Sequence, residues 1–150
     1  MRKINIIYAG GIKAQEKYYH EAVAEYIKRL SRDFKINNIE IKEEIDIKTE
    51  GKKILGKINP GAFKIALCVE GKKLTSEKFT SLLYSERAIN AQSVDFIIGS
   101  SHGLSDDVKK SADYLLSLSD MTFTHRLARV MLMEQIYRAY AIETGKKYHK

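Results

Sequence analysis

The sequence predicts an α/β fold: a mainly parallel sheet with helices on both faces, built as a single domain over residues 1–150. Three observations predict it. Short apolar runs alternate with longer segments of helical periodicity along the whole chain, as in parallel sheets with crossover helices. A length of 150 residues suits one domain with its own core. Pro60 is the only proline, and no repeat or low-complexity linker divides the chain.

The first part of the chain predicts two strands and two helices. In order, we expect a buried strand over 3–9, a surface helix over 14–30, a short strand over 36–41, a charged loop over 42–49 and a helix around 54–58. The strand over 36–41 is less hydrophobic than the first, which predicts an edge position. The first strand ends at Gly10-Gly11, but the third glycine and the acidic residue of a dinucleotide-binding fingerprint are missing.

The second part continues the alternation. We expect a strand over 63–69, a turn over 70–72, a helix starting near Thr75-Ser76, a strand over 94–98, a helix starting at Ser105, a strand over 114–118 and a final helix over 126–144. Each hydroxyl residue before a helix can accept a hydrogen bond from a free amide of the first turn. Acidic residues follow at Glu77, Asp106 and Asp107, where the helix dipole is positive.

The final predicted helix lacks a polar face. Its apolar residues surround it, and polar residues interrupt them singly: Leu127, Val130, Met131, Leu132, Met133, Ile136, Tyr137, Tyr140, Ala141 and Ile142. A helix that is apolar all round is covered on more than one side. One side can be the sheet, and a second copy in a twofold interface would cover the other, which predicts a homodimer. The alternative is a helix buried within the monomer.

Two loops that follow predicted strands make the candidate site. These are the small-residue loop 99–103 and the loop 119–125. In open α/β sheets, ligands bind in the crevice outside the carboxyl ends of the strands. The four histidines stand in unrelated contexts, Cys68 is the only cysteine, and no phosphate-binding loop or nucleophile elbow is present. The sequence therefore predicts no metal site and favours chemistry that belongs to a cofactor, such as methyl transfer from a sulfonium donor.

Charge and cysteine content indicate the partner and the compartment. The formal net charge is +7, and the basic excess is concentrated after His125. Such a balance favours a polyanionic partner such as nucleic acid. A single cysteine suits a reducing compartment, and no run approaches the ~20 apolar residues of a membrane span. We therefore expect a cytoplasmic protein with no membrane partner.

Four ordered segments resemble the ribosomal RNA large subunit methyltransferase H family of the SPOUT superfamily. They are 96–104, 117–125, 132–139 and the ending Tyr148-His149-Lys150, and the resemblance extends over the whole chain. It implies a C-terminal trefoil knot in the sheet and a homodimer. It also implies S-adenosyl-L-methionine-dependent methylation at N3 of a pseudouridine in large-subunit (23S) ribosomal RNA, within the assembled subunit or ribosome. An RNA- or ribosome-binding module of the same fold, without turnover, is the alternative.

The resemblance also implies the site residues. Cofactor contacts fall on Leu67, Gly99, Leu118, Ser119, Asp120, Met121, Thr122 and Phe123. On the substrate side we expect His125, Arg129 and Lys150 to contact RNA, and Arg138, Tyr148 and His149 to serve catalysis. An arginine can hold a phosphate with two hydrogen bonds, and a tyrosine or histidine can stack on a splayed base. The alternatives are packing roles for Leu67, Leu118, Met121 and Phe123, a local pair between Arg138 and Glu134, and a frayed tail.

Three positions depart from the family pattern. Ser100 stands where a second glycine is usual, His102 where a small or polar residue is common, and Thr124 where a proline is frequent. If position 100 required a positive φ, the serine would strain the loop. Loss of the proline would leave the turn before His125 less fixed.

Overall fold

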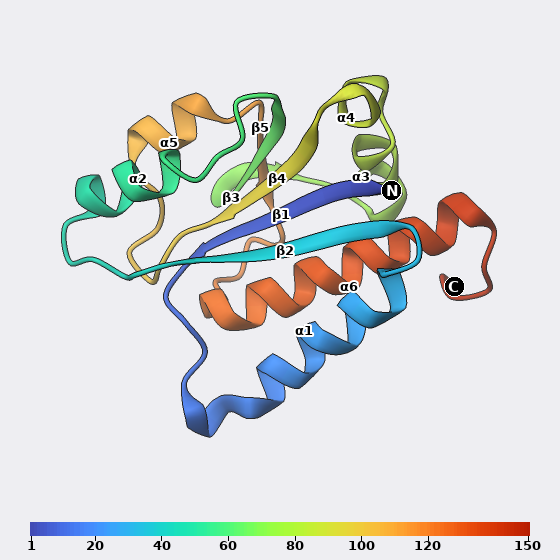
Figure 1. The fold of residues 1–150 in the computed structure, drawn as a ribbon, viewed down its shortest axis with the longest axis horizontal. Coiled ribbons are helices and arrows are strands. Elements are labelled where there is room, and N and C mark those ends of the chain that lie inside the picture. The colour runs from blue at the N-terminus through green and yellow to red at the C-terminus, as the bar shows by residue number, and fades with distance from the viewer.

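The computed structural model describes residues 1–150 and contains one five-stranded sheet in which every pair of neighbours is parallel. The strand order is β2-β1-β4-β3-β5. The strands are β1 (Arg2–Ala9), β2 (Phe34–Ile41), β3 (Ala62–Lys73), β4 (Ser93–Ile98) and β5 (Tyr114–Ser117). The predicted α/β class with a parallel sheet is confirmed. So is the edge position of the strand over 36–41, now β2 (Figure 1).

Helices cover both faces of the sheet, as expected. They are α1 (Lys17–Leu30), α2 (Ile47–Leu55), α3 (Ser76–Leu83), α4 (Glu86–Asn90), α5 (Asp106–Ser111) and α6 (His125–Thr144), with a 3-10 turn η1 (Ala14–Glu16) before α1. The larger core cluster joins the sheet to α1, α3 and α6, and the smaller one joins it to α2 and α5. Figure 1 shows α1 and α6 side by side beneath the sheet, with α2 and α5 on the other side.

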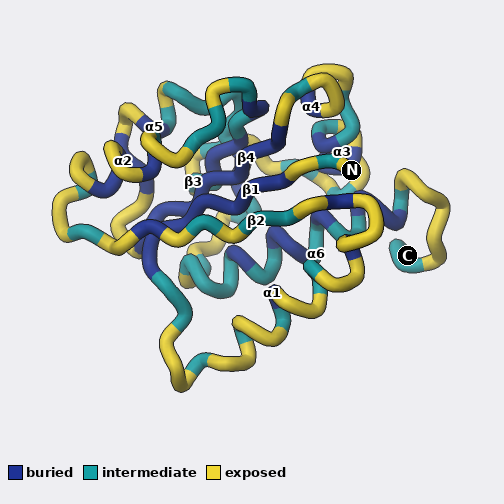
Figure 2. Tube along the Cα trace, in the orientation of Figure 1, coloured by how far each residue is buried: buried dark blue, intermediate teal, exposed yellow.

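The strand β1 supplies both core clusters because successive side chains of a strand point to opposite faces. Ile4 and Ile6 belong to the larger cluster, whereas Ile7 and Ala9 belong to the smaller one. All four are fully buried, and the central strands form the dark interior of Figure 2. A strand covered on both faces reads as a continuous apolar run, which is why 3–9 was recognisable from sequence.

The turn predicted over 70–72 is wrong, because β3 continues through these residues to Lys73. The pairing with β5 shifts register between Leu67 and Lys72, which marks a bulge, and resumes with Lys72 opposite Leu116. Gly71 lies at this irregularity, where a Cβ would stand 2.7 Å from the backbone carbon of Leu116. Glycine and flanking charges look like turn chemistry in isolation, but here they mark a close approach to β5.

The start of one helix and the presence of another also differ from prediction. The loop predicted over 42–49 ends early, since α2 begins at Ile47 after Asp46, whose side chain accepts a hydrogen bond from the Lys48 amide. The five-residue helix α4 was not predicted. The Ser85 hydroxyl begins it by accepting from the Ala88 amide, and so short a helix offers little periodicity to detect.

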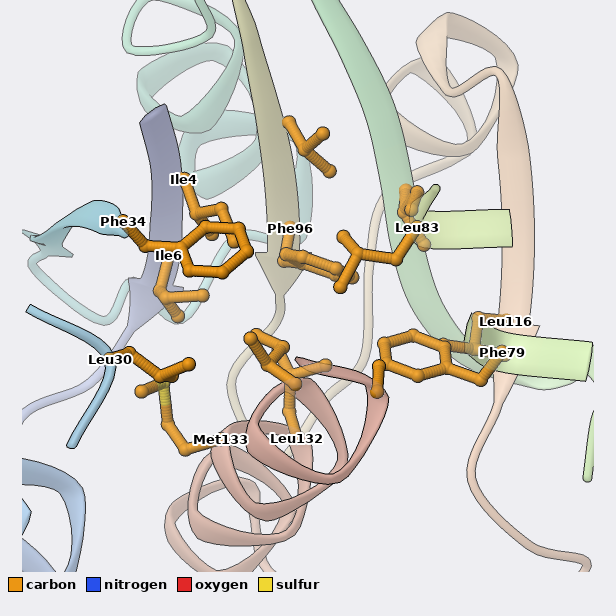
Figure 3. Packing of buried hydrophobic residues seen from close by; sticks show 14 of the residues in the cluster. Ile4, Ile6, Leu30, Phe34, Phe79, Leu83, Phe96, Leu116, Leu132 and Met133 are labelled. Atoms are coloured by element: carbon orange, nitrogen blue, oxygen red, sulfur yellow. The ribbon is translucent and has the colours of Figure 1, made fainter. Parts of the chain in front are cut away.

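The helix α6 is largely buried within the single chain. Leu132, Met133 and Ile136 are fully buried, and Figure 3 shows Leu132 and Met133 pointing from the helix into the core that holds Phe96 and Ile6. The helices α1 and α3 pack beside α6, while Val130 remains partly exposed. The monomer thus covers much of the apolar surface for which a partner was expected. No helix is long and apolar enough to cross a membrane.

We expect Leu132→Ala to lower the free energy of unfolding by about 2–5 kcal/mol, since the truncation leaves a cavity in the larger core cluster. Urea denaturation measures it. Ile89→Ala is the control, because Ile89 is 51% exposed and should change stability by only about 0.5 kcal/mol. Equal effects of the two substitutions would contradict the packing assigned to α6.

Candidate functional site

A cleft of about 720 Å³ opens at the carboxyl ends of the central strands. The end of β4 and its following loop form one wall, β3 and the segment after β5 form another, and the start of α6 closes it. The predicted cofactor residues Leu67, Gly99, Leu118, Ser119, Met121, Thr122 and Phe123 line it. Asp120 does not, because its carboxylate is exposed and pairs with Lys73. The two loops singled out in the sequence therefore do meet.

The loop 99–103 is a tight turn that depends on glycine at two positions. A Cβ at Gly99 would lie 2.6 Å from the Gly103 carbonyl oxygen, so a side chain would push the loop apart. Gly103 has φ +81°, and its amide donates to the Ser100 carbonyl at 2.9 Å. No residue other than glycine has a positive φ. Ser100 therefore causes no backbone strain.

Ser100 brings a hydroxyl to the cleft in place of a second glycine. The residue is 6% exposed and lines the cleft, and its Oγ has no hydrogen-bond partner within the protein. A buried hydroxyl without a partner is unfavourable unless a ligand or water satisfies it. The neighbouring departure, His102, is exposed and does not line the cleft.

The segment that leads from β5 to α6 is shaped by its own hydroxyl groups. Ser117 Oγ donates to the Ser119 carbonyl at 2.9 Å, and the Met121 amide donates to Ser119 Oγ at 3.0 Å. Thr124 has φ −59°, an angle typical of proline, and its Oγ1 accepts from the Leu127 amide at 3.3 Å. The cap thus holds the turn before α6 that proline would otherwise fix.

His125 begins α6 and lines the cleft, and one of its ring nitrogens has no hydrogen-bond partner. Its Nε2 is buried without a hydrogen bond, beside Gly10, whose φ of +87° only glycine adopts readily. Burial lowers the pKa of His125 below its ordinary value, and the positive charge of Arg126 lowers it further. The imidazole is therefore neutral at pH 7 and offers the cleft a donor or an acceptor according to its tautomer.

Protonation of His125 should destabilise the fold in mild acid. The unfolded chain takes up a proton at the ordinary pKa of about 6.5, whereas the folded chain, with its lowered pKa, does not. Stability is therefore unaffected above that value, falls as the pH drops through it, and levels off below the folded pKa. Urea denaturation at about pH 7.5 and about pH 5.5 should show a larger loss for wild type than for His125→Gln. Equal losses would contradict the assignment.

Arg129 is buried rather than presented to solvent. It is 3% exposed, and its guanidinium carbon lies 3.8 Å from the centre of the Tyr8 ring. Burial lowers the pKa of Arg129, which the nearby Tyr8 partly offsets, and Nε has no hydrogen-bond partner. An RNA contact at Arg129 stays a prediction. It would have to form at the edge of the guanidinium, because the Tyr8 ring covers one of its faces.

The predicted catalytic residues form a separate cluster with two glutamates. Arg138 pairs with Glu134 at 2.7 Å, and the Tyr148 hydroxyl donates to the same carboxylate at 3.1 Å. His149 lies between Arg138, 3.1 Å from Nδ1, and Glu77, 2.6 Å from Nε2. Burial, together with Glu134, raises the pKa of Tyr148 to about 12. The tail is therefore packed rather than frayed, and the local pair between Arg138 and Glu134 is present.

This tail cluster lies far from the cleft of its own chain. None of Arg138, Tyr148, His149 and Lys150 lines the cleft. Along α6, Arg138 lies ten positions after Ala128, the last residue of the helix that lines the cleft, which is about 15 Å at 1.5 Å per residue. After α6 the chain turns back, and the C-terminus lies beside the last turns of the helix (Figure 1). The structure thus brings together the predicted cofactor residues and, elsewhere, the predicted catalytic residues, but not the two sets.

The sequence reasoning missed residues around the cleft that carry charge. Lys13 and Glu43 line it, and the buried Glu50 stands behind it. Lys13 and Glu43 lie in polar connections with no distinguishing pattern. Glu50 did give a signal, because it lies one turn before Ile54 on the buried face of α2. No group of three or more His, Cys, Asp or Glu side chains is arranged to hold a metal ion.

Comparisons with known proteins match the sequence of this chain to a family. Residues 2–149 match the family described as predicted SPOUT methyltransferase. The chain is 44% identical to a ribosomal RNA large subunit methyltransferase H of Streptococcus agalactiae serotype III (strain NEM316), covering 99% of each chain. It is 47% identical to the protein of the same name from Caldicellulosiruptor bescii, covering 98% of this chain and 99% of that one.

The fold also has a relative among solved structures. A probable methylase family protein from Haemophilus influenzae Rd KW20 superposes with a TM-score of 0.56 at 10% identity, over 99% of this chain and 70% of that one. So low an identity supports the fold alone. The near full-length sequence matches carry more, and by them this chain belongs to the SPOUT methyltransferases, within the ribosomal RNA large subunit methyltransferase H family.

Proposed function

We propose that this protein transfers a methyl group from S-adenosyl-L-methionine to N3 of a pseudouridine in large-subunit ribosomal RNA. The cleft is the observation that carries the proposal: all but one of the predicted cofactor residues line it. Support also comes from the relatives, whose names specify ribosomal RNA of the large subunit. The basic net charge of +7 suits an RNA partner.

The residues of the cleft fit this cofactor. Gly99 lines the cleft with backbone alone, and Leu67, Leu118 and Phe123 offer apolar contact to a flat ring. Ser100 Oγ and His125 Nε2 are buried without partners and suit a polar ligand. When bound, S-adenosyl-L-methionine would supply an electrophilic methyl group. The chain's own residues then have to orient the acceptor and remove one proton.

We further propose that the working site is shared between two copies. None of the tail-cluster residues lines the cleft, and Arg138 lies about 15 Å along α6 from Ala128, the last residue of the helix that does. A second apolar groove of about 430 Å³, lined partly by Leu74, Val130 and Met131, lies between α3 and α6. A homodimer formed over this side would cover the groove and bring one chain's tail to the partner's cleft. The C-terminal trefoil knot and the cytoplasmic location are part of the same proposal.

The tail cluster suits proton transfer from the N3 imide. His149 would accept the proton at Nδ1, in place of the hydrogen bond that this nitrogen receives from Arg138 at 3.1 Å. The Glu77 carboxylate, 2.6 Å from Nε2, would stabilise the resulting imidazolium. Arg138 would stabilise negative charge that develops on the base. Tyr148, half-buried and against the Glu134 carboxylate, would help to hold Arg138 in place and offers a ring for stacking.

Methyl transfer from labelled S-adenosyl-L-methionine tests the proposal directly. Wild-type protein is incubated with intact ribosomes, isolated large subunits and free ribosomal RNA, and the modified nucleotide is mapped by mass spectrometry. We expect one methyl group on a pseudouridine, with assembled particles preferred over free RNA. RNA binding with ordinary salt dependence but no methyl incorporation would favour the binding-module alternative. Absence of cofactor binding by calorimetry would refute the proposal.

A further inference from the structure

Glu50 has a buried side chain whose hydrogen bonds leave its own helix. The residue is 1% exposed. Its Oε1 accepts from the Ser100 amide at 3.3 Å, and its Oε2 accepts from the Glu44 amide at 3.0 Å. A carboxylate is costly to bury unless its oxygens are hydrogen-bonded. Both oxygens are satisfied here by the backbone of other segments, so the position of Glu50 and the positions of those segments depend on each other.

The two segments that Glu50 joins are neighbours at the edge of the cleft. Ser100 lies in the turn after β4, next to Gly99. Glu44 follows Glu43, which lines the cleft and accepts a long hydrogen bond of 3.4 Å from the Ser101 hydroxyl. Glu50 itself does not line the cleft. It therefore acts from behind, on backbone that faces the ligand.

The next residue, Gly51, packs against Ser105, where the chain leaves the loop that follows β4. Any Cβ at Gly51 would overlap the Ser105 hydroxyl, so the glycine lets α2 approach this residue closely. Ser105 Oγ accepts from the Val108 amide at 3.3 Å and so begins α5. The pair Glu50–Gly51 thus contacts both ends of the segment 100–105. By contrast, the turn bond between Ser100 and Gly103 lies within the loop and does not fix it relative to the rest of the fold.

We propose that Glu50 is a positioning residue: its carboxylate holds the Ser100 amide and thereby sets the loop 99–103 in the geometry that binds the methyl donor. The identity of that ligand rests on the proposed function. The mechanical role does not, since it follows from burial and from the two backbone hydrogen bonds. Neither the family resemblance nor the predicted site included this residue.

Two substitutions of Glu50 should weaken cofactor binding to different degrees. In Glu50→Gln the side chain keeps its size, but one oxygen becomes an NH2 donor that faces a backbone N–H, whichever way the amide is turned. In Glu50→Ala both acceptors are lost. We expect the Kd for S-adenosyl-L-methionine to rise about tenfold in Glu50→Gln and further in Glu50→Ala. Without any cofactor, the Ser100 amide should exchange with deuterium at least about tenfold faster in Glu50→Ala.

Asp46→Ala is the matched control, because it weakens the same helix from its exposed start. Asp46 accepts from the Lys48 amide and the Thr49 hydroxyl and touches neither the loop nor the cleft lining. We expect lower stability but unchanged Kd and unchanged exchange at Ser100. If Asp46→Ala shifts both as much as Glu50→Ala does, or if Glu50→Ala leaves Ser100 exchange unaltered, the proposal is overturned. A wild-type protein that binds no cofactor refutes the proposed function, while the exchange measurement still decides the role of Glu50.

Discussion

Substituting Gly99 by alanine is expected to abolish tight binding of S-adenosyl-L-methionine and to reduce methyl transfer by about 100-fold or more. The added Cβ would lie 2.6 Å from the Gly103 carbonyl oxygen and 2.9 Å from a methyl carbon of Leu104. The first of these is backbone, which cannot turn aside as a flexible side chain can. The loop must therefore open, and the cleft wall that it forms moves with it.

Gly56→Ala is the control for this substitution. Gly56 follows α2 with φ −66°, and a Cβ there would meet only backbone oxygens at 3.5 and 3.6 Å, which is ordinary contact. We expect unchanged cofactor affinity and stability unchanged or slightly raised. Calorimetry with the cofactor and urea denaturation compare the two variants. A Gly99→Ala protein that binds as tightly as wild type would show that the loop is not part of the cofactor site.

The second large effect is expected from Arg138→Ala, which should lower kcat by about 100-fold and leave the Kd for S-adenosyl-L-methionine unchanged. The two readouts separate because Arg138 lies outside the cleft of its own chain but contacts His149 and Glu134 in the tail cluster. Loss of the guanidinium removes the positive charge that would stabilise negative charge developing on the acceptor base. Labelled methyl transfer into ribosomes under saturating cofactor measures kcat.

Arg29→Ala is a matched control for Arg138→Ala. Arg29 also pairs with a glutamate one helical turn earlier, Glu25 at 3.0 Å, and it stacks on Tyr137. Both substitutions therefore remove an i,i+4 ion pair and cation–π stacking, from an exposed site at Arg29 and from a half-buried one at Arg138. We expect normal kcat for Arg29→Ala. Full activity of Arg138→Ala would remove the tail cluster from the mechanism and leave the cleft as the only functional feature.

Much of the fold was predictable because its signals are local. A strand buried on both faces has a nearly continuous apolar sequence, as at 94–98, where only Asp95 interrupts the run. The helix starts at Thr75 and Ser105 could be recognised from a hydroxyl residue, whose oxygen can accept a hydrogen bond from an amide three residues later. Both of these hydrogen bonds are present. The prediction of a turn over 70–72 was wrong because the same residues form part of a strand when another backbone approaches closely. That partner, near Leu116, is more than forty residues away.

The two loops of the site were also predictable from the sequence. Loop 99–103 and the segment 118–123 follow strands of one parallel sheet, so their meeting at one edge follows from the fold class. Ser100 was expected to strain the loop if position 100 needed a positive φ, and it does not. The burial of Arg129 against Tyr8 was not foreseen, because the aromatic partner belongs to the first strand.

The sequence by itself determined the α/β class, the parallel sheet, the edge strand, the caps and the family, since each depends on periodicity, on neighbours within one helical turn, or on motifs in order. Only the tertiary structure decided how distant groups satisfy one another. It placed Glu50 behind the amide of Ser100, and it placed Arg138 and His149 together in a cluster outside the cleft. A buried polar group must find a partner wherever the fold supplies one, and the chain's local pattern does not say where.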